Sequence, residues 1–238
     1  MGFDVLNLLH NYGWNSAVST HLTRDLDNLH RDVMTMSVMV EELVKRAWEQ
    51  LKSPDFDLAK SLAEEDDHID QWDVQIEESC LKILALYQPV AGDLRRIATV
   101  LKISNELERV ADLGVNIAER AMGIMKGPVI TIPETLPEMM RIAVKMLNQS
   151  IDAYVRLDND LAREVFATDH HVDSLQLQII TQLRGVMRAE HDCIEPALHL
   201  FSASRHIERI ADHATNIAED VVYLVEGAIV RHQRHVMS

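Results

Sequence analysis

The sequence predicts an all-helical protein made of two tandem three-helix bundles. Glycine and proline are scarce, with eight and six residues among 238, and good helix formers such as leucine, alanine and glutamate take their place. Apolar residues recur at spacings of three and four, as at Leu29, Val33, Met36, Val40 and Leu43. This spacing is typical of amphipathic helices. The third observation is an internal repeat.

The second half of the chain repeats the first. The segment 108–119, which contains ERVAD and NIAE, recurs 100 residues later at 208–219 as ERIAD and NIAE. The acidic segment 66–70 recurs 103 residues later at 169–173. A repeat of this kind indicates two copies of one structural unit. We expect the first unit at 16–127 and the second at 134–238.

Prolines divide each copy into helices, because proline breaks a helix and the residue before it avoids the helical region. Pro54 and Pro89 separate helices of the first copy, and the segment 127–133 separates the copies. The predicted helices are 17–52, 56–87, 91–126, 135–157, 159–190 and 193–227. Short connections between them favour antiparallel bundles. Residues 1–15 have no counterpart in the second copy and form either a short extra helix or a flexible extension.

Charge and hydropathy limit the possible functions. The formal net charge of −15 repels nucleic-acid backbones and anionic lipids, which argues against direct nucleic-acid or membrane-surface binding. No stretch approaches the ~18 apolar residues of a membrane-spanning helix, and residues 1–15 lack a leader pattern. We therefore expect a cytoplasmic protein without membrane insertion. Cys80 and Cys193 lack a CxxC partner and are interpreted as reduced core thiols.

Four pairs of acidic residues, each spaced four apart, lie at matching places in the copies. The pairs are Asp66 with Asp70, Glu108 with Asp112, Asp169 with Asp173, and Glu208 with Asp212. Each pair projects from one helix face, where like charges repel. Because each copy carries its two pairs on neighbouring antiparallel helices, four carboxylates could converge on iron, zinc, manganese or magnesium. The alternative is a solvated acidic face.

Two asparagines extend these acidic stripes by one turn. Asn116 follows Asp112, and Asn216 follows Asp212, by four residues each. Asparagine is a poor helix former, so its recurrence predicts a hydrogen bond, which would orient a ligand carboxylate or a water molecule. A buried interhelical hydrogen bond without any metal explains the pattern equally well.

Signatures of catalysis are absent from the sequence. There is no P-loop, GxSxG, HExxH or GxGxxG motif. A di-iron enzyme needs Glu-x-x-His on two helices. Glu65 and His68 supply it once, but the second copy has Thr168 and His171. We predict that the chain is not an enzyme, and a carboxylate-bridged metal-binding protein or metalloenzyme remains the alternative.

Two segments of the chain resemble the PhoU family. They are YQPVAGDLR at 87–95, followed by ELERVAD at 106–112, and SRHIERIADHATNIAE at 204–219, followed by YLVEG at 223–227. In the second copy, Cys193 takes the place of Asp93 and Pro196 that of Arg96. A role of 93–96 in partner binding is therefore not expected of the second copy.

The resemblance implies two PhoU repeats, commonly in a homodimer, in the cytoplasm of a bacterium or archaeon. It implies negative regulation of the phosphate-specific ABC transporter and of phosphate-starvation signalling. The implied partners are the transporter's ATPase subunit and a phosphate-sensing membrane histidine kinase, which would recruit the chain to the inner face of the membrane. Multinuclear iron or zinc bound at ExxxD and DxxxD motifs is also implied, and those motifs correspond to the four acidic pairs. A helical adaptor without a metal or phosphate role is the remaining hypothesis.

Overall fold

The computed structural model describes residues 14–227, and side chains from residue 20 onward. Its helices are α1 (Trp14–Lys52), α2 (Phe56–Tyr87), α3 (Ala91–Ile124), α4 (Thr135–Arg156), α5 (Asn159–Ala189) and α6 (Ile194–Glu226), with a 3-10 turn η2 (His191–Cys193) before the last. Every predicted helix is present, and its ends lie within three residues of the prediction. Residues 1–13 of the predicted extension lie outside the described residues. Residues 14 and 15, the last two of the predicted extension, belong to α1, which begins at Trp14.

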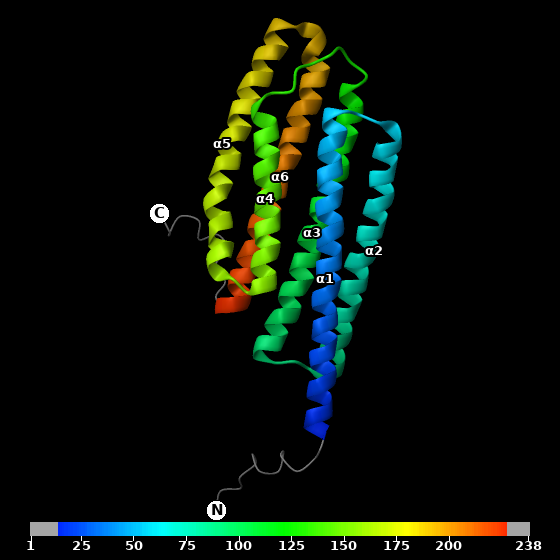
Figure 1. The fold of residues 1–238 in the computed structure, drawn as a ribbon, viewed down its shortest axis with the longest axis vertical. Helices are drawn as coiled ribbons and strands as arrows, with labels where there is room; N and C mark the ends of the chain where they lie inside the picture. Colours follow the sequence, from blue (N-terminus) through cyan, green and yellow to red (C-terminus); the bar gives the residue numbers. More distant parts are fainter. Residues whose placement is uncertain (1–13, 228–238) are drawn as a thin grey trace, which may run out of the picture.

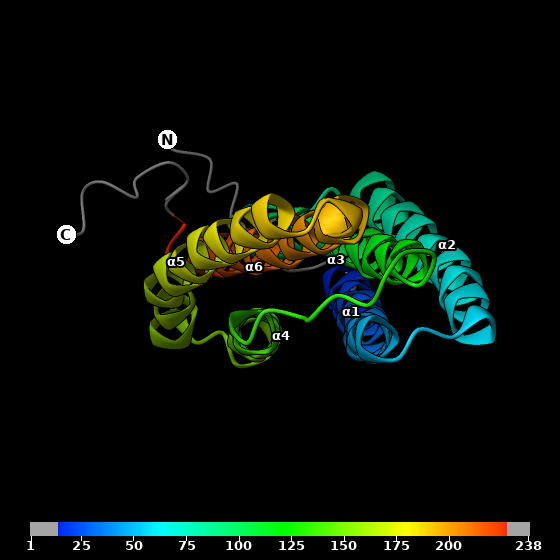
Figure 2. The same cartoon turned by 90° about the horizontal axis from the view of Figure 1, so that it is seen from above.

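The helices form two bundles that share a central layer. Helices α1, α2 and α3 make one bundle, and α4, α5 and α6 make the other (Figure 1). Seen from above, α3 and α6 lie side by side in the middle, α2 and α5 form the outer edges, and α1 and α4 lie on one common face (Figure 2). The predicted all-α fold with two tandem three-helix bundles is confirmed. None of the helices within residues 14–227 has an apolar run long enough to cross a bilayer.

The repeat is visible in how the helices begin. The carboxylate of Asp55 caps α2 by accepting a hydrogen bond from the Leu58 amide at 2.8 Å. Asp158, at the matching place of the second copy, caps α5 through the Leu161 amide at 3.0 Å. Such caps satisfy amides that a helix leaves unpaired at its start, and losing one costs about 1 kcal/mol. Both copies therefore use the same local device to start their middle helix.

The core is built from the apolar stripes predicted by the sequence. Met36, Val40 and Leu43 of α1 are fully buried, as the spacing of three and four requires of one helix face. At Gly114, α3 comes so close to α1 that an added Cβ would lie 2.3 Å from Leu43 Cδ2. A glycine is therefore needed at this crossing because a side chain would collide with a packed core.

The two bundles are joined along α3 and α6, which run antiparallel. Lys102 Nζ lies 2.8 Å from Asp220 Oδ1, and Asp220 is only 1% exposed. Towards the other end of the pair, Gly123 packs on the ring of His199, which lies 2.4 Å from the position of an added Cβ. Contacts at both ends make this interface a continuous part of the core.

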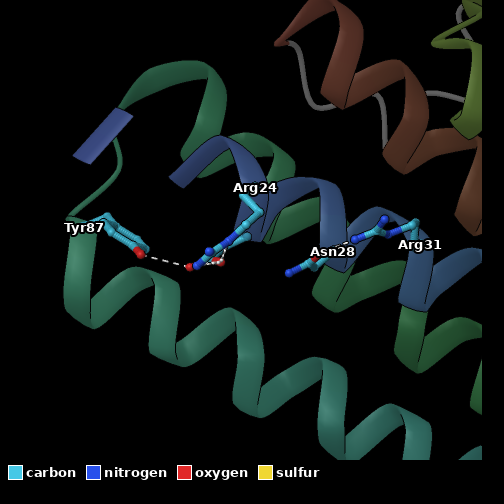
Figure 3. Close-up of polar contacts among 5 residues, drawn as sticks. Arg24, Asn28, Arg31 and Tyr87 are labelled. Carbon is cyan, nitrogen blue, oxygen red and sulfur yellow. Dashed lines mark hydrogen bonds and ion pairs between the residues drawn. The ribbon is translucent and has the colours of Figure 1, made fainter. Parts of the chain in front are cut away.

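Polar contacts also fasten the end of α2 to α1. The hydroxyl of Tyr87 donates a hydrogen bond to Asp25 Oδ2 at 2.9 Å, and Arg24 lies beside the same carboxylate (Figure 3). On the next turns of α1, the Arg31 guanidinium donates to the side chain of Asn28 (Figure 3). The hydrogen bond to Asp25 raises the pKa of Tyr87. Since α2 ends at Tyr87, this contact ties the last residue of α2 to α1.

Candidate metal centres

The four acidic pairs form two clusters, one in each bundle. The first lies on α2 and α3, and the second on α5 and α6. In the first cluster Asp66 and Glu108 are half-buried, whereas Asp70 and Asp112 are exposed. The second cluster is more enclosed, since its four carboxylates include Asp169, which is only 7% exposed. Helix periodicity explains why both carboxylates of a pair lie together, because residues four apart share one face of a helix. Within a pair, the more buried carboxylate is the one nearer the neighbouring helix.

The carboxylates of the first cluster lie close enough to oppose one another's ionisation. Burial, followed by the charges of Asp112, Asp70 and Glu108, raises the pKa of Asp66 from 3.8 to about 7. Burial and Asp112 likewise raise the pKa of both Asp70 and Glu108. Like charges disfavour ionisation only when they are near. The structure thus brings the four predicted carboxylates of α2 and α3 into one negative site.

The second cluster follows the same plan with one added cation. Burial, followed by the charge of Asp212, raises the pKa of Glu208, and Asp173 and Asp169 contribute as well. Arg205 opposes this effect, because its Nη1 lies 3.3 Å from Glu208 Oε1. The four predicted carboxylates of α5 and α6 therefore also share a site, but that site is partly neutralised.

A fifth carboxylate, which the sequence pattern of pairs did not include, belongs to the first cluster. Asp73 raises the pKa of Asp70 and Glu108, and it accepts a hydrogen bond from the Ser104 hydroxyl. It follows Asp66 by seven residues, so two turns of helix place it on the same stripe. The repeat did not reveal it, because the second copy has Gln176 there. Gln176 is 4% exposed, and neither of its amide atoms has a hydrogen-bond partner.

The chemistry of the clusters fits a hard cation. Asp66 Oδ1 and Glu208 Oε2 are buried oxygens without a hydrogen-bond partner, which is costly for a carboxylate unless a cation or donor is supplied. Within residues 14–227, no three His, Cys, Asp or Glu side chains stand in a geometry ready to hold an ion. The all-carboxylate donor set matches ions that prefer oxygen ligands.

The recurring asparagines make different hydrogen bonds. Asn116 donates to the backbone carbonyl of Asp112 in its own helix at 2.8 Å. Asn216 donates across the bundle interface to Glu106 Oε2 at 3.1 Å. Neither bond reaches a side-chain carboxylate of the acidic pairs. The interhelical bond that the sequence left as an alternative is thus present at Asn216.

Glu106 is the centre of a polar network that the sequence pattern did not predict. His213 Nδ1 lies 2.5 Å from its Oε2, and both side chains are nearly buried. Burial alone would raise the pKa of Glu106, but the hydrogen bonds from His213 and Asn216 outweigh it, so the pKa is lowered. The matching residue in the second copy is His206. Because the network joins unlike residues of the two copies, comparing the copies could not reveal it.

The histidines beside the acidic pairs lie outside the clusters. His171 Nε2 is 3.6 Å from Glu138 Oε1 of α4, and His68 is exposed. Glu65, the other half of the single Glu-x-x-His spacing, forms an ion pair with Arg46 of α1. Glu65 and His171 are therefore committed to other contacts.

Comparison with known proteins gives a consistent result. A family model described as "PhoU domain" matches twice, at residues 33–121 and 136–221. The chain is 39% identical over 212 residues to the "Phosphate-specific transport system accessory protein PhoU homolog" of Aquifex aeolicus, covering 89% of this chain and 96% of that protein. It is 33% identical to the PhoU protein of Escherichia coli, covering 96% and 92%. The crystal structure of PhoU from Pseudomonas aeruginosa superposes with a TM-score of 0.83 at 34% identity, covering 87% of this chain and 99% of that one.

Proposed function

The chain belongs to the PhoU family, and on that premise we propose that it regulates phosphate uptake by a phosphate-specific transport system. The names of its relatives carry this proposal, since they describe accessory proteins of that system and align over nearly the whole chain. The regulation is negative: the chain restrains the transporter and phosphate-starvation signalling when phosphate is plentiful. Its partners are the ATPase subunit of the ABC transporter and a phosphate-sensing membrane histidine kinase.

The role is one of binding and not of catalysis. The only thiols of the chain, Cys80 and Cys193, are buried, and burial raises the pKa of Cys80 to about 12. A thiol in that state is a poor nucleophile. We place the chain in the cytoplasm, as a homodimer that its partners recruit to the inner face of the membrane.

We further propose that each bundle holds metal ions at its acidic cluster. In the first bundle Asp66, Asp70, Glu108 and Asp112 would be the ligands, and Asp73 is close enough to assist. An ion would neutralise the mutual repulsion of these carboxylates and tie α2 to α3. The oxygen-only donor set favours iron, manganese or magnesium over zinc, which more often takes imidazole or thiolate ligands. Asp169, Asp173, Glu208 and Asp212 would do the same for α5 and α6.

The regulatory proposal is tested in cells that lack the chain. Restoring the native chain should return phosphate uptake and starvation-gene expression to their repressed levels in phosphate-rich medium, and pull-downs should recover the ATPase subunit and the kinase. Unchanged uptake and expression after deletion, together with failure to recover either partner, would refute it.

The metal proposal is tested separately by elemental analysis of tag-free protein purified without chelators. A variant with Glu108→Gln and Asp112→Asn should lose bound metal from the first cluster. Its matched control carries Asp160→Asn and Glu164→Gln, an exposed acidic pair with the same spacing on α5, and should retain it. Equal metal content in both variants, with each still helical, would exclude these carboxylates as ligands and leave the regulatory proposal standing.

A further inference from the structure

A cavity of about 160 Å³ lies between the two bundles, with walls that include α1 and α4. These two helices lie on one common face (Figure 2). Helices from both copies of the repeat contribute residues to its walls. Ten residues of α1, α3, α4, α6 and the turn after α4 line it, among them Asp27 and His30 of α1, Arg96 of α3, and Tyr154 and Val155 of α4. None of these residues belongs to the acidic clusters, so the cavity is independent of the proposed metal centres.

Three hydrogen-bond donors meet in this cavity. The ring of His30 lies 5.3 Å from the ring of Tyr154, centroid to centroid, so the two side chains adjoin across the gap between α1 and α4. Arg96 comes from the second turn of α3. Among the side chains of residues 20–227, no carboxylate forms an ion pair with this guanidinium. The charge of Arg96 is therefore not neutralised by an ion pair within this part of the chain.

The charges around the cavity favour an anion. Burial, followed by the charge of Arg96, lowers the pKa of His30, and the opposing effect of Asp27 is the smallest of the three. Burial raises the pKa of Tyr154 to about 12. The charge of Arg96 opposes this rise, and Asp27 does not contribute to it. Near neutral pH, both His30 and Tyr154 are therefore uncharged donors beside a permanent positive charge. Asp27 and Arg96 are both exposed, so water screens both charges, but Arg96 has the larger effect on His30 and Asp27 has none on Tyr154.

The remaining walls select a ligand that is only partly polar. Six of the ten lining residues are leucine or valine. An apolar cavity of about 150 Å³ accommodates a molecule the size of benzene, so the space fits one ring or a short branched chain. Inorganic phosphate would leave some of its oxygens against leucine and valine without a donor, which is costly.

We propose that this cavity binds a small organic monocarboxylate whose carboxylate faces Arg96 and Tyr154 and whose apolar body lies against the leucines and valines. The ligand bridges the two bundles, because its polar and apolar contacts come from both. The second copy has Pro196 where the first has Arg96, so the repeat does not reproduce the guanidinium. The site goes beyond the regulation proposed above and does not depend on it.

Benzoate is the probe for this proposal, titrated into the full-length protein by calorimetry and by NMR of the leucine and valine methyl groups. We expect saturable binding at one site per chain, with shifts confined to methyl groups of the cavity. Arg96→Gln should weaken binding by about tenfold or more, as loss of a charge-assisted hydrogen bond predicts. Arg95→Gln removes the neighbouring charge on α3 without touching the cavity, and should leave the affinity within about twofold.

Two competing ligands test separately the charge and the organic body of the proposed ligand. Benzamide has the same shape without the charge and should bind at least about tenfold more weakly than benzoate. Inorganic phosphate at equal concentration should not displace benzoate. Absence of saturable benzoate binding, equal binding of benzamide, displacement by phosphate, or unchanged affinity in Arg96→Gln would each overturn the proposal. If Arg96→Gln does not fold, Val155→Phe, which fills the cavity from its exposed edge, must abolish binding instead.

Discussion

Replacing Asp66 by asparagine should stabilise the metal-free protein at alkaline pH. The pKa of Asp66 is about 7 in the folded chain, against 3.8 for an ordinary aspartate. Folding therefore favours the protonated form, and ionisation of Asp66 destabilises the folded chain. The destabilisation is absent below about pH 3.8, grows as the pH rises, and is complete above about pH 7.

The magnitude follows from the two pKa values. At about 1.4 kcal/mol per pH unit, the difference between 3.8 and about 7 amounts to about 4 kcal/mol. Asp66 is only half-buried, and salt screens its acidic neighbours, so we expect about 1 to 2 kcal/mol in solution. For a chain of this size, that corresponds to a rise in Tm of about 2 to 8 °C.

The assay is thermal unfolding, followed by circular dichroism in the presence of a chelator. Asp66→Asn should raise Tm at pH 8, and the gain should shrink to almost nothing near pH 4. Glu78→Gln, at an exposed position on the same helix, is the control and should change Tm little at either pH. With manganese or iron added instead of chelator, the proposed metal site predicts the opposite sign, because the variant would lack one of the proposed ligands.

A specific result would refute this reasoning. If Asp66→Asn left Tm unchanged or lowered it at pH 8 in chelator, the carboxylates could not be repelling one another as the structure indicates. A gain that was equal at pH 4 and pH 8 would show that the effect is steric and not electrostatic.

Three other predictions concern packing, the bundle interface and the thiols. Gly114→Ala should lower the free energy of unfolding, measured in urea, by about 1 to 3 kcal/mol. Its control is Gly185→Ala, which should raise that free energy by about 0.5 to 1 kcal/mol because no atom lies near the added Cβ. Effects of equal sign would contradict the packing at Gly114. Lys102→Met should cost about 1 to 3 kcal/mol at pH 7, because the buried Asp220 loses its ammonium partner; a loss below about 0.5 kcal/mol would show that the pair contributes little. Cys80 should react with a thiol reagent at pH 8 only as fast as the chain unfolds, since burial raises its pKa to about 12; rapid labelling of the folded protein would mean that the thiol is accessible.

Local chemistry explains why the helices and the acidic pairs were predictable. Helix ends depend on prolines and capping residues adjacent in sequence, such as Pro54 and Asp55. Apolar spacing marks the buried face of each helix, and a spacing of four places Glu108 and Asp112 on one side of α3 whatever surrounds them. The repeat added that the same arrangement occurs twice. Asp73 was available to the same reasoning, since it continues the stripe of Asp66, but it has no acidic counterpart in the second copy to mark it.

Contacts between helices far apart in the chain depended on the tertiary structure. Glu106 meets His213, and Lys102 meets Asp220, only because α3 and α6 pack antiparallel in one register. These partners are unlike residues more than 100 positions apart, so neither periodicity nor repetition marks them. The cavity around Arg96 likewise exists only where four helices from both bundles come together. Sequence pattern determines which face of a helix is apolar or acidic, whereas the side chains that face each other are decided by the angle and register at which the helices pack.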